Sequence, residues 1–369
     1  MKKLLLIPIL LFLFSCSTQK EVVKEKEEIK LEEKTSQLEK KKSFNFVFDI
    51  YKKKINSNLR GISVVDSSTA WASGSNGIIL RTTDGGSSWQ EFKVKGYETL
   101  DFRDIEAFDK NTAIVMCIDA PAFFFKTNDG GKTWKRKYMN RDPRIFFDGF
   151  AFWDSKNGIA FSDPIDGKFY FVKTNDGGET WKDISNMNIS SSSKNEGGFA
   201  ASGTSIAVYG KDLVWFGTGG SDKSRIYFSE DAGLNWRAVD VPIKSGNSSS
   251  GVFSIAFKDE LNGIAVGGDY KDDKNKNQNC AFTDDGGLSW QSIDSNNPNG
   301  FRSCVAWNNF LNIFIATGTS GTDYSLDNGK SWIYADNKSY NSIGVSKTDG
   351  TCFLVGNNGS IARLKIKAQ

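Results

Sequence analysis

Three arginines in the same local context are the residues of this chain best suited to bind a charged ligand. They occur in Leu59-Arg60-Gly61, Phe102-Arg103-Asp104 and Phe301-Arg302-Ser303, each after an apolar residue at the start of a predicted strand. A guanidinium group binds a carboxylate or a phosphate through two parallel hydrogen bonds. If the three strands occupy equivalent places around one centre, their arginines predict a site there for an anion or an acidic peptide.

Acidic residues in the same parts of the chain could belong to this site or neutralise the positive charge of its arginines. Asp104, Glu106 and Asp148 could pair with the arginines and merely neutralise them, as in many structural charge networks. Asp163 and Glu196 could contribute further carboxylates, although Asp, Pro and Gly are also the usual turn residues. The predicted partner-binding site consists of Arg60, Arg103, Arg302, Asp104, Asp148 and Glu196.

The elements that would position this site come from a repeat with the pattern Ser/Thr-x-Asp-x-Gly-x-x-Trp. Its six aspartates lie 45, 47, 55, 54 and 42 residues apart: Asp84, Asp129, Asp176, Asp231, Asp285 and Asp327. Such an aspartate can accept backbone N–H bonds within a tight turn, and the glycine supplies the positive φ that the turn requires. The repeated motif therefore predicts a structural turn between strands, and residues that differ between the copies are the candidates for function.

Each period contains four short predicted strands, which is the content of one propeller blade. After Trp332 come three more strands without the motif, and an apolar strand at 44–51 is predicted to complete this last blade and cover its free edge. The sequence predicts an all-β fold, a seven-bladed β-propeller of four-stranded antiparallel blades, with six blades as the alternative. The three arginines would then meet at the channel mouth, on the face away from the repeated turns.

The repeated motif is similar to the Asp-box, or BNR repeat, of β-propeller proteins. The sequence between the copies resembles that of the photosystem II stability/assembly factor-like BNR proteins, as in LRGISVVDSSTAWASGSNGIILRTTDGGSSW. This resemblance covers residues 44–369. It implies a seven-bladed propeller that serves as a binding platform or assembly factor.

The N-terminus predicts export and anchoring. Lys2 and Lys3 precede an apolar run that is too short to cross about 30 Å of hydrocarbon, so residues 1–15 are predicted to be a signal peptide. The end of this segment, Leu-x-Ser-Cys, resembles a bacterial lipobox, which implies that Cys16 is lipidated and binds the membrane. Residues 17–43 alternate Lys and Glu without aromatic residues and predict a solvated tether. The expected domains are the signal peptide, residues 16–43 with the lipidated cysteine and tether, and a propeller at 44–369.

Composition narrows the possible activities. The chain has no histidine, which argues against a Ser-His-Asp triad and a His-ligated zinc site. No dinucleotide-binding glycine motif opens a helix after a strand, so we expect neither cofactor nor metal. A net charge of +3 gives no strong field for nucleic acid. Four cysteines resemble buried small hydrophobes, although a disulfide is not excluded by sequence: Cys117, Cys280, Cys304 and Cys352.

The predicted function is therefore a non-catalytic protein-binding scaffold or assembly factor, lipid-anchored in the bacterial cell envelope. The alternative is a sialidase-like propeller that binds or hydrolyses glycans. Two carboxylates about 5–9 Å apart in a deep channel pocket would favour hydrolysis. An arginine-lined channel without such a pair would favour binding.

Overall fold

A computed structural model describes residues 43–368 of the chain, apart from 53 and 185. Residues 46–365 form one compact unit, which contains nearly all of the propeller described below. The predicted signal peptide, Cys16 and the tether up to residue 42 lie outside the described residues. In the described part of the chain no helix has the length and apolar character needed to cross a membrane.

The strands form seven four-stranded antiparallel sheets, numbered here as blades in chain order. Blade 1 contains β2 (Leu59–Val64), β3 (Ala70–Gly74), β4 (Ile79–Thr82) and β5 (Gln90–Phe92). Blade 2 contains β6 (Phe102–Ala107), β7 (Ala113–Cys117), β8 (Ala122–Thr127) and β9 (Lys135–Asn140). Blade 3 contains β10 (Phe147–Phe152), β11 (Gly158–Ile165), β12 (Lys168–Thr174) and β13 (Lys182–Asp183).

The second half of the chain repeats this organisation. Blade 4 contains β14 (Ile206–Tyr209), β15 (Leu213–Thr218), β16 (Ser224–Ser229) and β17 (Arg237–Val241). Blade 5 contains β18 (Ser250–Phe257), β19 (Gly263–Asp269), β20 (Cys280–Thr283) and β21 (Gln291–Ser292). Blade 6 contains β22 (Cys304–Asn308), β23 (Ile313–Gly318), β24 (Gly321–Ser325) and β25 (Ile333–Asp336).

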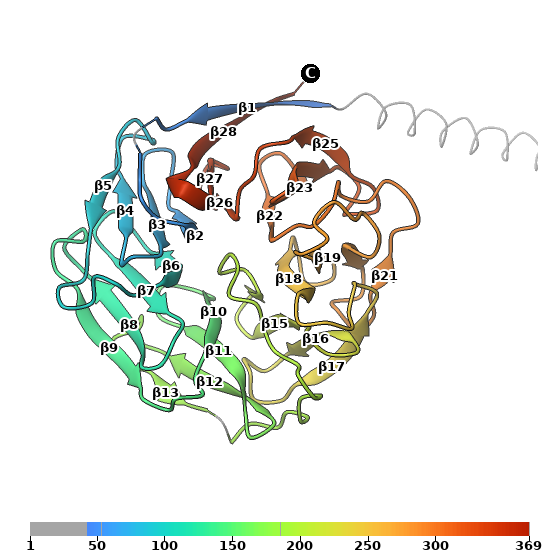
Figure 1. The fold of residues 1–369 in the computed structure, drawn as a ribbon, viewed down its shortest axis with the longest axis horizontal. Helices are drawn as coiled ribbons and strands as arrows, with labels where there is room; N and C mark the ends of the chain where they lie inside the picture. Colours follow the sequence, from blue (N-terminus) through green and yellow to red (C-terminus); the bar gives the residue numbers. More distant parts are fainter. Residues whose placement is uncertain (1–42, 53, 185, 369) are drawn as a thin grey trace, which may run out of the picture. The chain divides into compact units, whose positions relative to one another are not determined.

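Blade 7 joins the two ends of the chain. Its sheet has the order β1-β28-β27-β26, with β26 (Ser342–Val345), β27 (Cys352–Val355), β28 (Ile361–Ala368) and β1 (Phe44–Ile50). A short 3-10 helix, η1 (Asn357–Gly359), precedes β28. The blades follow one another around a ring in Figure 1. Seven blades and closure by the N-terminal strand are confirmed, and the six-bladed alternative is wrong.

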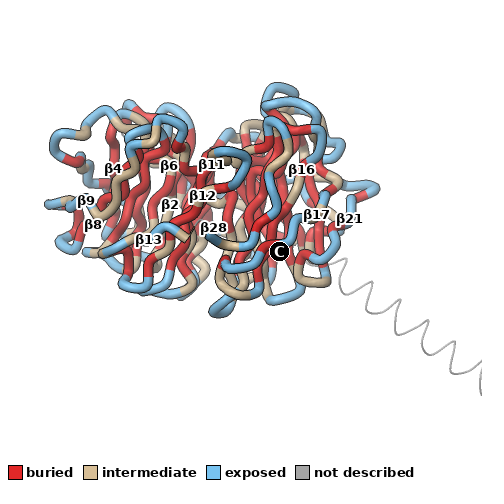
Figure 2. Tube along the Cα trace, turned by 90° about the horizontal axis from the view of Figure 1, so that it is seen from below, coloured by how far each residue is buried: buried red, intermediate tan, exposed pale blue. Residues whose placement is uncertain are grey.

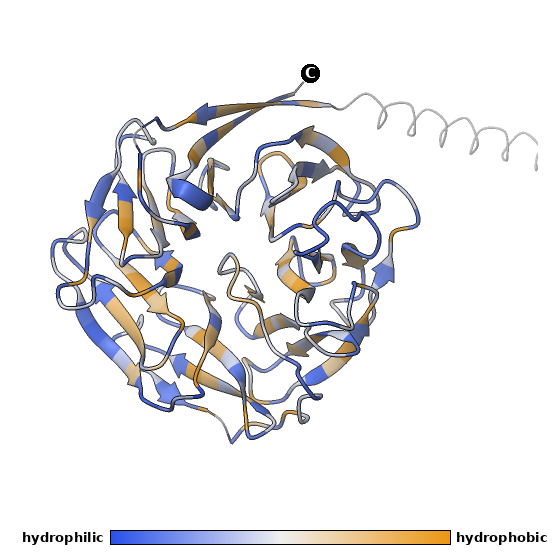
Figure 3. Cartoon of the chain, viewed as in Figure 1, coloured by the Kyte–Doolittle hydropathy of each residue, from blue (hydrophilic) through white to orange (hydrophobic). Residues whose placement is uncertain are grey.

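Burial decreases from the inner strands of each blade to its outermost strand. In blade 1 every residue of β3 is buried, whereas Gln90 and Glu91 of the outer strand β5 are exposed. Figure 2 shows buried strand centres with exposed turns at both ends, and Figure 3 shows the apolar residues within the strands. The inner strands need apolar residues on both faces because each blade packs between two others.

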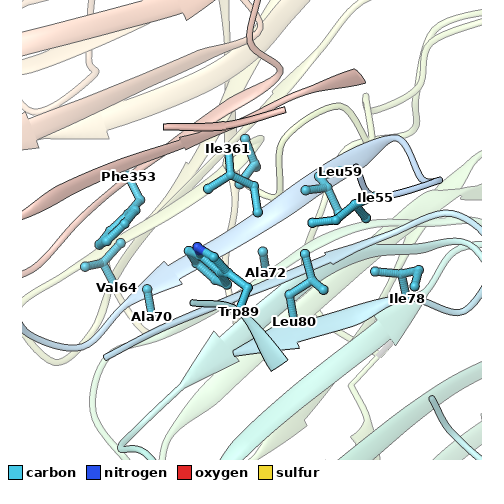
Figure 4. Packing of buried hydrophobic residues seen from close by; sticks show 11 residues of the cluster. Ile55, Leu59, Val64, Ala70, Ala72, Ile78, Leu80, Trp89, Phe353 and Ile361 are labelled. Atoms are coloured by element: carbon cyan, nitrogen blue, oxygen red, sulfur yellow. The ribbon is translucent and has the colours of Figure 1, made fainter. Parts of the chain in front are cut away.

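The hydrophobic core lies between blades. Trp89, the tryptophan of the first Asp-box, packs with its ring perpendicular to that of Phe353 of blade 7, at 5.6 Å between ring centroids. Figure 4 shows this cluster, in which Leu80 and Ile361 belong to blades 1 and 7. Because each tryptophan packs across a blade boundary, the repeated motif helps to set the contact between neighbouring sheets as well as the turn.

The six Asp-box turns share one hydrogen-bond network. In the first, Thr82 Oγ1 donates to Asp84 Oδ1 at 2.8 Å and accepts from Gly86 N at 2.9 Å. Ser88 donates to the same carboxylate through its backbone N–H, at 2.9 Å, and its hydroxyl, at 2.6 Å. The carboxylate is therefore used entirely within its own turn, in a structural role.

The four cysteines of the propeller, Cys117, Cys280, Cys304 and Cys352, are buried and free.

Candidate functional site

The channel mouth is occupied by a segment of the chain itself. The connection from β13 to β14 is longer than the other blade connections, and its last residues turn into the middle of the ring (Figure 1). We call residues 196–205 the channel segment. It contains the sequence Glu-Gly-Gly-Phe-Ala-Ala-Ser-Gly-Thr-Ser.

The channel segment forms hydrogen bonds to every blade outside its own. The bonds are Arg60 Nη1 to Ala201 O, Arg103 Nη1 to Ala200 O, Gly198 N to Asp163 Oδ1, Ile255 N to Thr204 O, Ser202 Oγ to Ser303 O, and Ser342 Oγ to Ser202 O. These bonds come from blades 1, 2, 3, 5, 6 and 7. In addition, Phe199 stacks on Phe253 of blade 5 with 3.8 Å between ring centroids. The segment thus closes the place where a ligand was expected.

Arg60 and Arg103 meet at this segment, and each donates to a backbone carbonyl at 3.2 Å. Both side chains are partly exposed. Arg103 also donates to Asp101 at 2.9 Å, whereas no carboxylate of the described residues forms an ion pair with Arg60. Burial, followed by repulsion from Arg103, lowers the pKa of Arg60. This pair of guanidiniums therefore holds unused donors and a net positive charge at the mouth.

Arg302 does not join that pair. Its side chain is 0% exposed and forms an ion pair with Asp323 of β24, whose exposure is 1%. Its guanidinium also donates to Phe301 O and to Ser320 Oγ, at 2.8 and 2.7 Å. The prediction of a three-arginine ring is corrected to a pair, because the third arginine is enclosed with an acidic partner that lies more than 20 residues along the chain.

Asp104 is a buried residue whose carboxyl lies against Gly203 of the channel segment. It accepts from Ile105 N at 2.8 Å and Phe150 N at 2.9 Å. Burial nevertheless raises its pKa well above the usual range. Gly203 of the channel segment has φ +73° and lies so close that a Cβ there would overlap the Asp104 carboxyl. Asp104 therefore supports packing and is too enclosed to bind a partner.

Asp148 and Asp163 form a second buried acidic contact under the same segment. Burial and then the neighbouring Asp163 carboxylate raise the pKa of Asp148 well above its usual range. Burial also raises the pKa of Asp163, to about 6, although Gly198 N donates to it at 2.8 Å. Neither carboxyl oxygen of Asp148 has a hydrogen-bond partner among the described residues, so nothing offsets the cost of burying its charged form.

Glu196 is a fully buried anchor at the start of the segment. Its carboxylate accepts from Thr218 Oγ1 at 2.8 Å and from the Tyr227 hydroxyl at 3.2 Å, and pairs with Arg225 at 3.2 Å. All three partners belong to blade 4 or its turns. Of the predicted site residues, only Arg60 and Arg103 are accessible. Asp104, Asp148 and Glu196 hold the channel segment in place.

Sequence reasoning missed the channel segment as an element. The signal for it was the interval of 55 residues between Asp176 and Asp231, the longest of the six-copy series, together with a small-residue run at 197–205. The described residues contain no group of three or more metal-ligating side chains placed to hold an ion.

Comparisons with known proteins agree with this architecture. The sequence model described as photosynthesis system II assembly factor YCF48 matches residues 41–146. A solved structure of YCF48 bound to D1 peptide is 15% identical, with a TM-score of 0.58 over 86% of this chain and 94% of that chain. The structure of YCF48 from Cyanidioschyzon merolae is 17% identical, with a TM-score of 0.58 over 86% and 98%.

A glycoside hydrolase shares the fold as well. The GH74 xyloglucanase from Xanthomonas campestris is 14% identical, with a TM-score of 0.56 over 86% of this chain but 53% of that chain. No protein with a curated description matches the sequence. The predicted resemblance to a photosystem II assembly factor-like BNR propeller is confirmed, and the solved structures show the shared fold.

Proposed function

We propose that this protein is a non-catalytic scaffold that binds an acidic segment of a partner protein at Arg60 and Arg103. The observation that carries the proposal is the pair of partly exposed guanidiniums, of which Arg60 has no ion-pair partner among the described residues. Carboxylates are natural ligands for such a pair. A fold relative solved with a bound D1 peptide gives additional support, since a propeller of this shape is known to accept a peptide.

The buried carboxyls argue against the alternative of glycoside hydrolysis. Asp148 is 1% exposed and lies under Gly198 of the channel segment, so a glycan cannot reach its carboxyl. Asp104 is likewise enclosed by Gly203. A hydrolase would need an acid and a second carboxylate on opposite sides of an accessible scissile bond.

Arg60→Gln and Arg103→Gln together test the binding proposal. The full-length protein and this double variant are used to capture partners from native membranes, and captured proteins are identified and then titrated as purified peptides. We expect at least a tenfold loss of affinity for the identified acidic peptide. Arg237→Gln, an exposed arginine on another part of the ring, is the matched control and should bind as the parent does.

Two outcomes would contradict the proposal. Equal binding by the double variant, with unchanged thermal unfolding, would exclude the arginine pair as the site. Hydrolysis of a glycan substrate by the parent protein would favour the alternative.

We further propose that the scaffold is tethered to a bacterial envelope membrane through lipidated Cys16. The signal-like residues 1–15 and the lipobox-like end support this, and both lie outside the described residues. Cys16→Ser should shift the protein from the detergent phase to the aqueous phase on phase separation, and mass spectrometry of the parent should find an acylated N-terminal cysteine. A parent protein that partitions like the variant would refute the anchor.

A further inference from the structure

Several turn tips on the Asp-box face of blades 4–6, away from the channel mouth, carry large exposed apolar side chains. Four of the large exposed side chains lie at turn tips there: Leu234 (55% exposed), Leu261 (56%), Leu288 (54%) and Phe310 (55%). We call these four residues the tip cluster. They come from the Asp-box turns of blades 4 and 5 and from the first hairpin turns of blades 5 and 6.

The two kinds of turn lie side by side within a blade. In blade 5, Gly286 N of the Asp-box donates to Leu261 O of the first hairpin at 2.9 Å. The same bond joins the two turns in blades 1 to 4, where the acceptors are Ser68 O, Asn111 O, Lys156 O and Asp212 O. Leu261 and Leu288 are therefore neighbours on one surface, and Trp215 Nε1 of blade 4 donates to Gly286 O at 2.8 Å across the blade boundary.

The turns themselves do not require apolar tips. Leu234 and Leu288 directly follow the conserved glycine of the Asp-box. At this position blades 1 to 3 and blade 6 carry Ser87, Lys132, Glu179 and Lys330. At the first hairpin tip, blades 1 to 3 carry Ser68, Asn111 and Lys156. Polar residues satisfy the same geometry, so turn geometry does not account for the leucines of blades 4 and 5. Contiguous apolar surface exposed to water, as at the adjoining turns of Leu261 and Leu288, is typical of a binding surface.

Acidic residues surround the tip cluster. Asp212, Glu260 and Asp284 are exposed, and none of them forms an ion pair with another described residue. Hydrogen bonds within the turns keep the pKa of Asp231 and Asp285 below the usual range, so both are also ionised at neutral pH. The exposed cations nearby are Lys211, Lys330 and Arg237, of which Arg237 pairs with Glu230. Lys258 pairs with Asp259, and Lys173 donates to Ala232 O of the blade 4 Asp-box. The surface therefore combines apolar tips with a negative field.

We propose that the Asp-box face of blades 4–6 docks a basic amphipathic segment of a partner protein. The apolar side of such a segment would cover the tip cluster, and its lysines or arginines would face Asp212, Glu260 and Asp284. Charge complementarity selects this occupant, since an anionic lipid surface would be repelled by the same carboxylates. The site is independent of the arginine pair, which lies at the opposite ends of the strands.

A designed helical peptide with leucines on one side and lysines on the other tests this surface. It is titrated into the full-length protein by fluorescence anisotropy, beside an analogue in which every lysine is replaced by glutamate. The variant Leu234→Lys, Leu261→Lys, Leu288→Lys should weaken binding of the lysine peptide by about tenfold or more, because it removes the apolar area that the peptide would bury and adds three charges that repel its lysines. The fold should tolerate it, since Lys132 and Lys156 occupy equivalent positions in other blades.

Two further variants measure the contribution of the acidic residues and provide a control on the same face. Glu260→Gln with Asp284→Asn should weaken binding by about two- to fivefold and reduce its salt dependence. Lys132→Ser, on the same face in blade 2, is the matched control and should bind within about twofold of the parent.

Four results would overturn the proposal. These are no binding of the lysine peptide, equal binding of the glutamate analogue, binding of vesicles rich in anionic lipid that depends on the three leucines, and self-association of the protein that the leucine variant abolishes. The last two would assign the surface to a membrane or to a second copy.

Discussion

The carboxylates of the Asp-box turns and those of the channel wall lie in opposite environments. In the turns, hydrogen bonds from Thr133 and neighbouring groups lower the pKa of Asp129 to about 2. In the channel wall, burial raises the pKa of Asp163 to about 6 and that of Asp104 and Asp148 well above the usual range. Hydrogen bonds from the turn therefore favour the charged carboxylate of Asp129, whereas burial disfavours the charged form of Asp104, Asp148 and Asp163.

The difference follows from how each region is built. An Asp-box carboxylate receives its donors from residues within four positions, at the water-exposed end of the blade. A channel carboxyl is enclosed by a segment that arrives from another blade and supplies few donors. The first arrangement is local and repeated six times, whereas the second occurs once and depends on the closed ring.

The largest effect is expected from Arg302→Gln in the channel wall. This change leaves Asp323 buried without its cation, and breaking such a pair costs about 3–5 kcal/mol of unfolding free energy. Chemical denaturation monitored by tryptophan fluorescence measures it. Replacing both partners, as in Arg302→Met with Asp323→Leu, should cost clearly less. Equal losses in the two variants would mean that the ion pair itself is not the source of the effect.

The pH dependence of unfolding should separate the two regions. Asp163 has a raised folded-state pKa, so its contribution to stability is complete below the unfolded pKa near 4 and is lost as the pH rises through about 6, by about 2–3 kcal/mol. Asp129 and Asp176, with pKa values of about 2, contribute above pH 4 and lose their contribution as the pH falls toward 2. Asp163→Asn should flatten the profile between pH 4 and 6 only. An unchanged profile there would contradict the assignment.

Gly203→Ala should destabilise the protein by about 2 kcal/mol, because a side chain at φ +73° is strained and would also meet Asp104. Gly210→Ala is the matched control: its φ is +62°, and no atom lies within 4 Å of the added Cβ. The control should lose only the part due to backbone conformation, as measured by thermal unfolding. A loss as large as that of Gly203→Ala would show that the channel segment is not tightly seated.

The smallest effect is expected in a single Asp-box. Asp231→Ala removes the acceptor for Ser229, Asn235 and Leu234 and should cost about 1 kcal/mol, as for a lost helix or turn cap. Glu230→Ala, at the neighbouring exposed position, should change the unfolding free energy by less than about 0.5 kcal/mol. If the two variants behave alike, the shared network of the Asp-box has no measurable role in stability.

Much of the fold could be predicted because its signals are local. The aspartate spacing defined the blades, and the alternating apolar residues defined their strands, so seven four-stranded sheets and closure by the strand near Phe44 followed from the sequence. The arginines of blades 1 and 2 were also placed correctly relative to each other, since equivalent positions of a ring face one centre.

The site was predicted less well because its contacts are distant in sequence. The partner of Arg302 is Asp323 on another strand of the same blade, and no motif marks that pair. Asp148 was expected at the surface of the mouth, but the segment around Gly198 covers it. Which charged groups remain accessible depends on the path of the connection from β13 to β14. The length of this connection can be read from the sequence, but its path across the ring cannot.

The sequence by itself determined the repeat, the turn chemistry, the number of blades and the resemblance to assembly-factor propellers, because each depends on residues a few positions apart. Only the tertiary structure decided that the channel is closed by residues 196–205, that one arginine pair stays accessible, and that four apolar tips share one acidic face. Those properties arise when ring closure brings side chains from different blades within contact distance, and burial then sets which of them keep their charge.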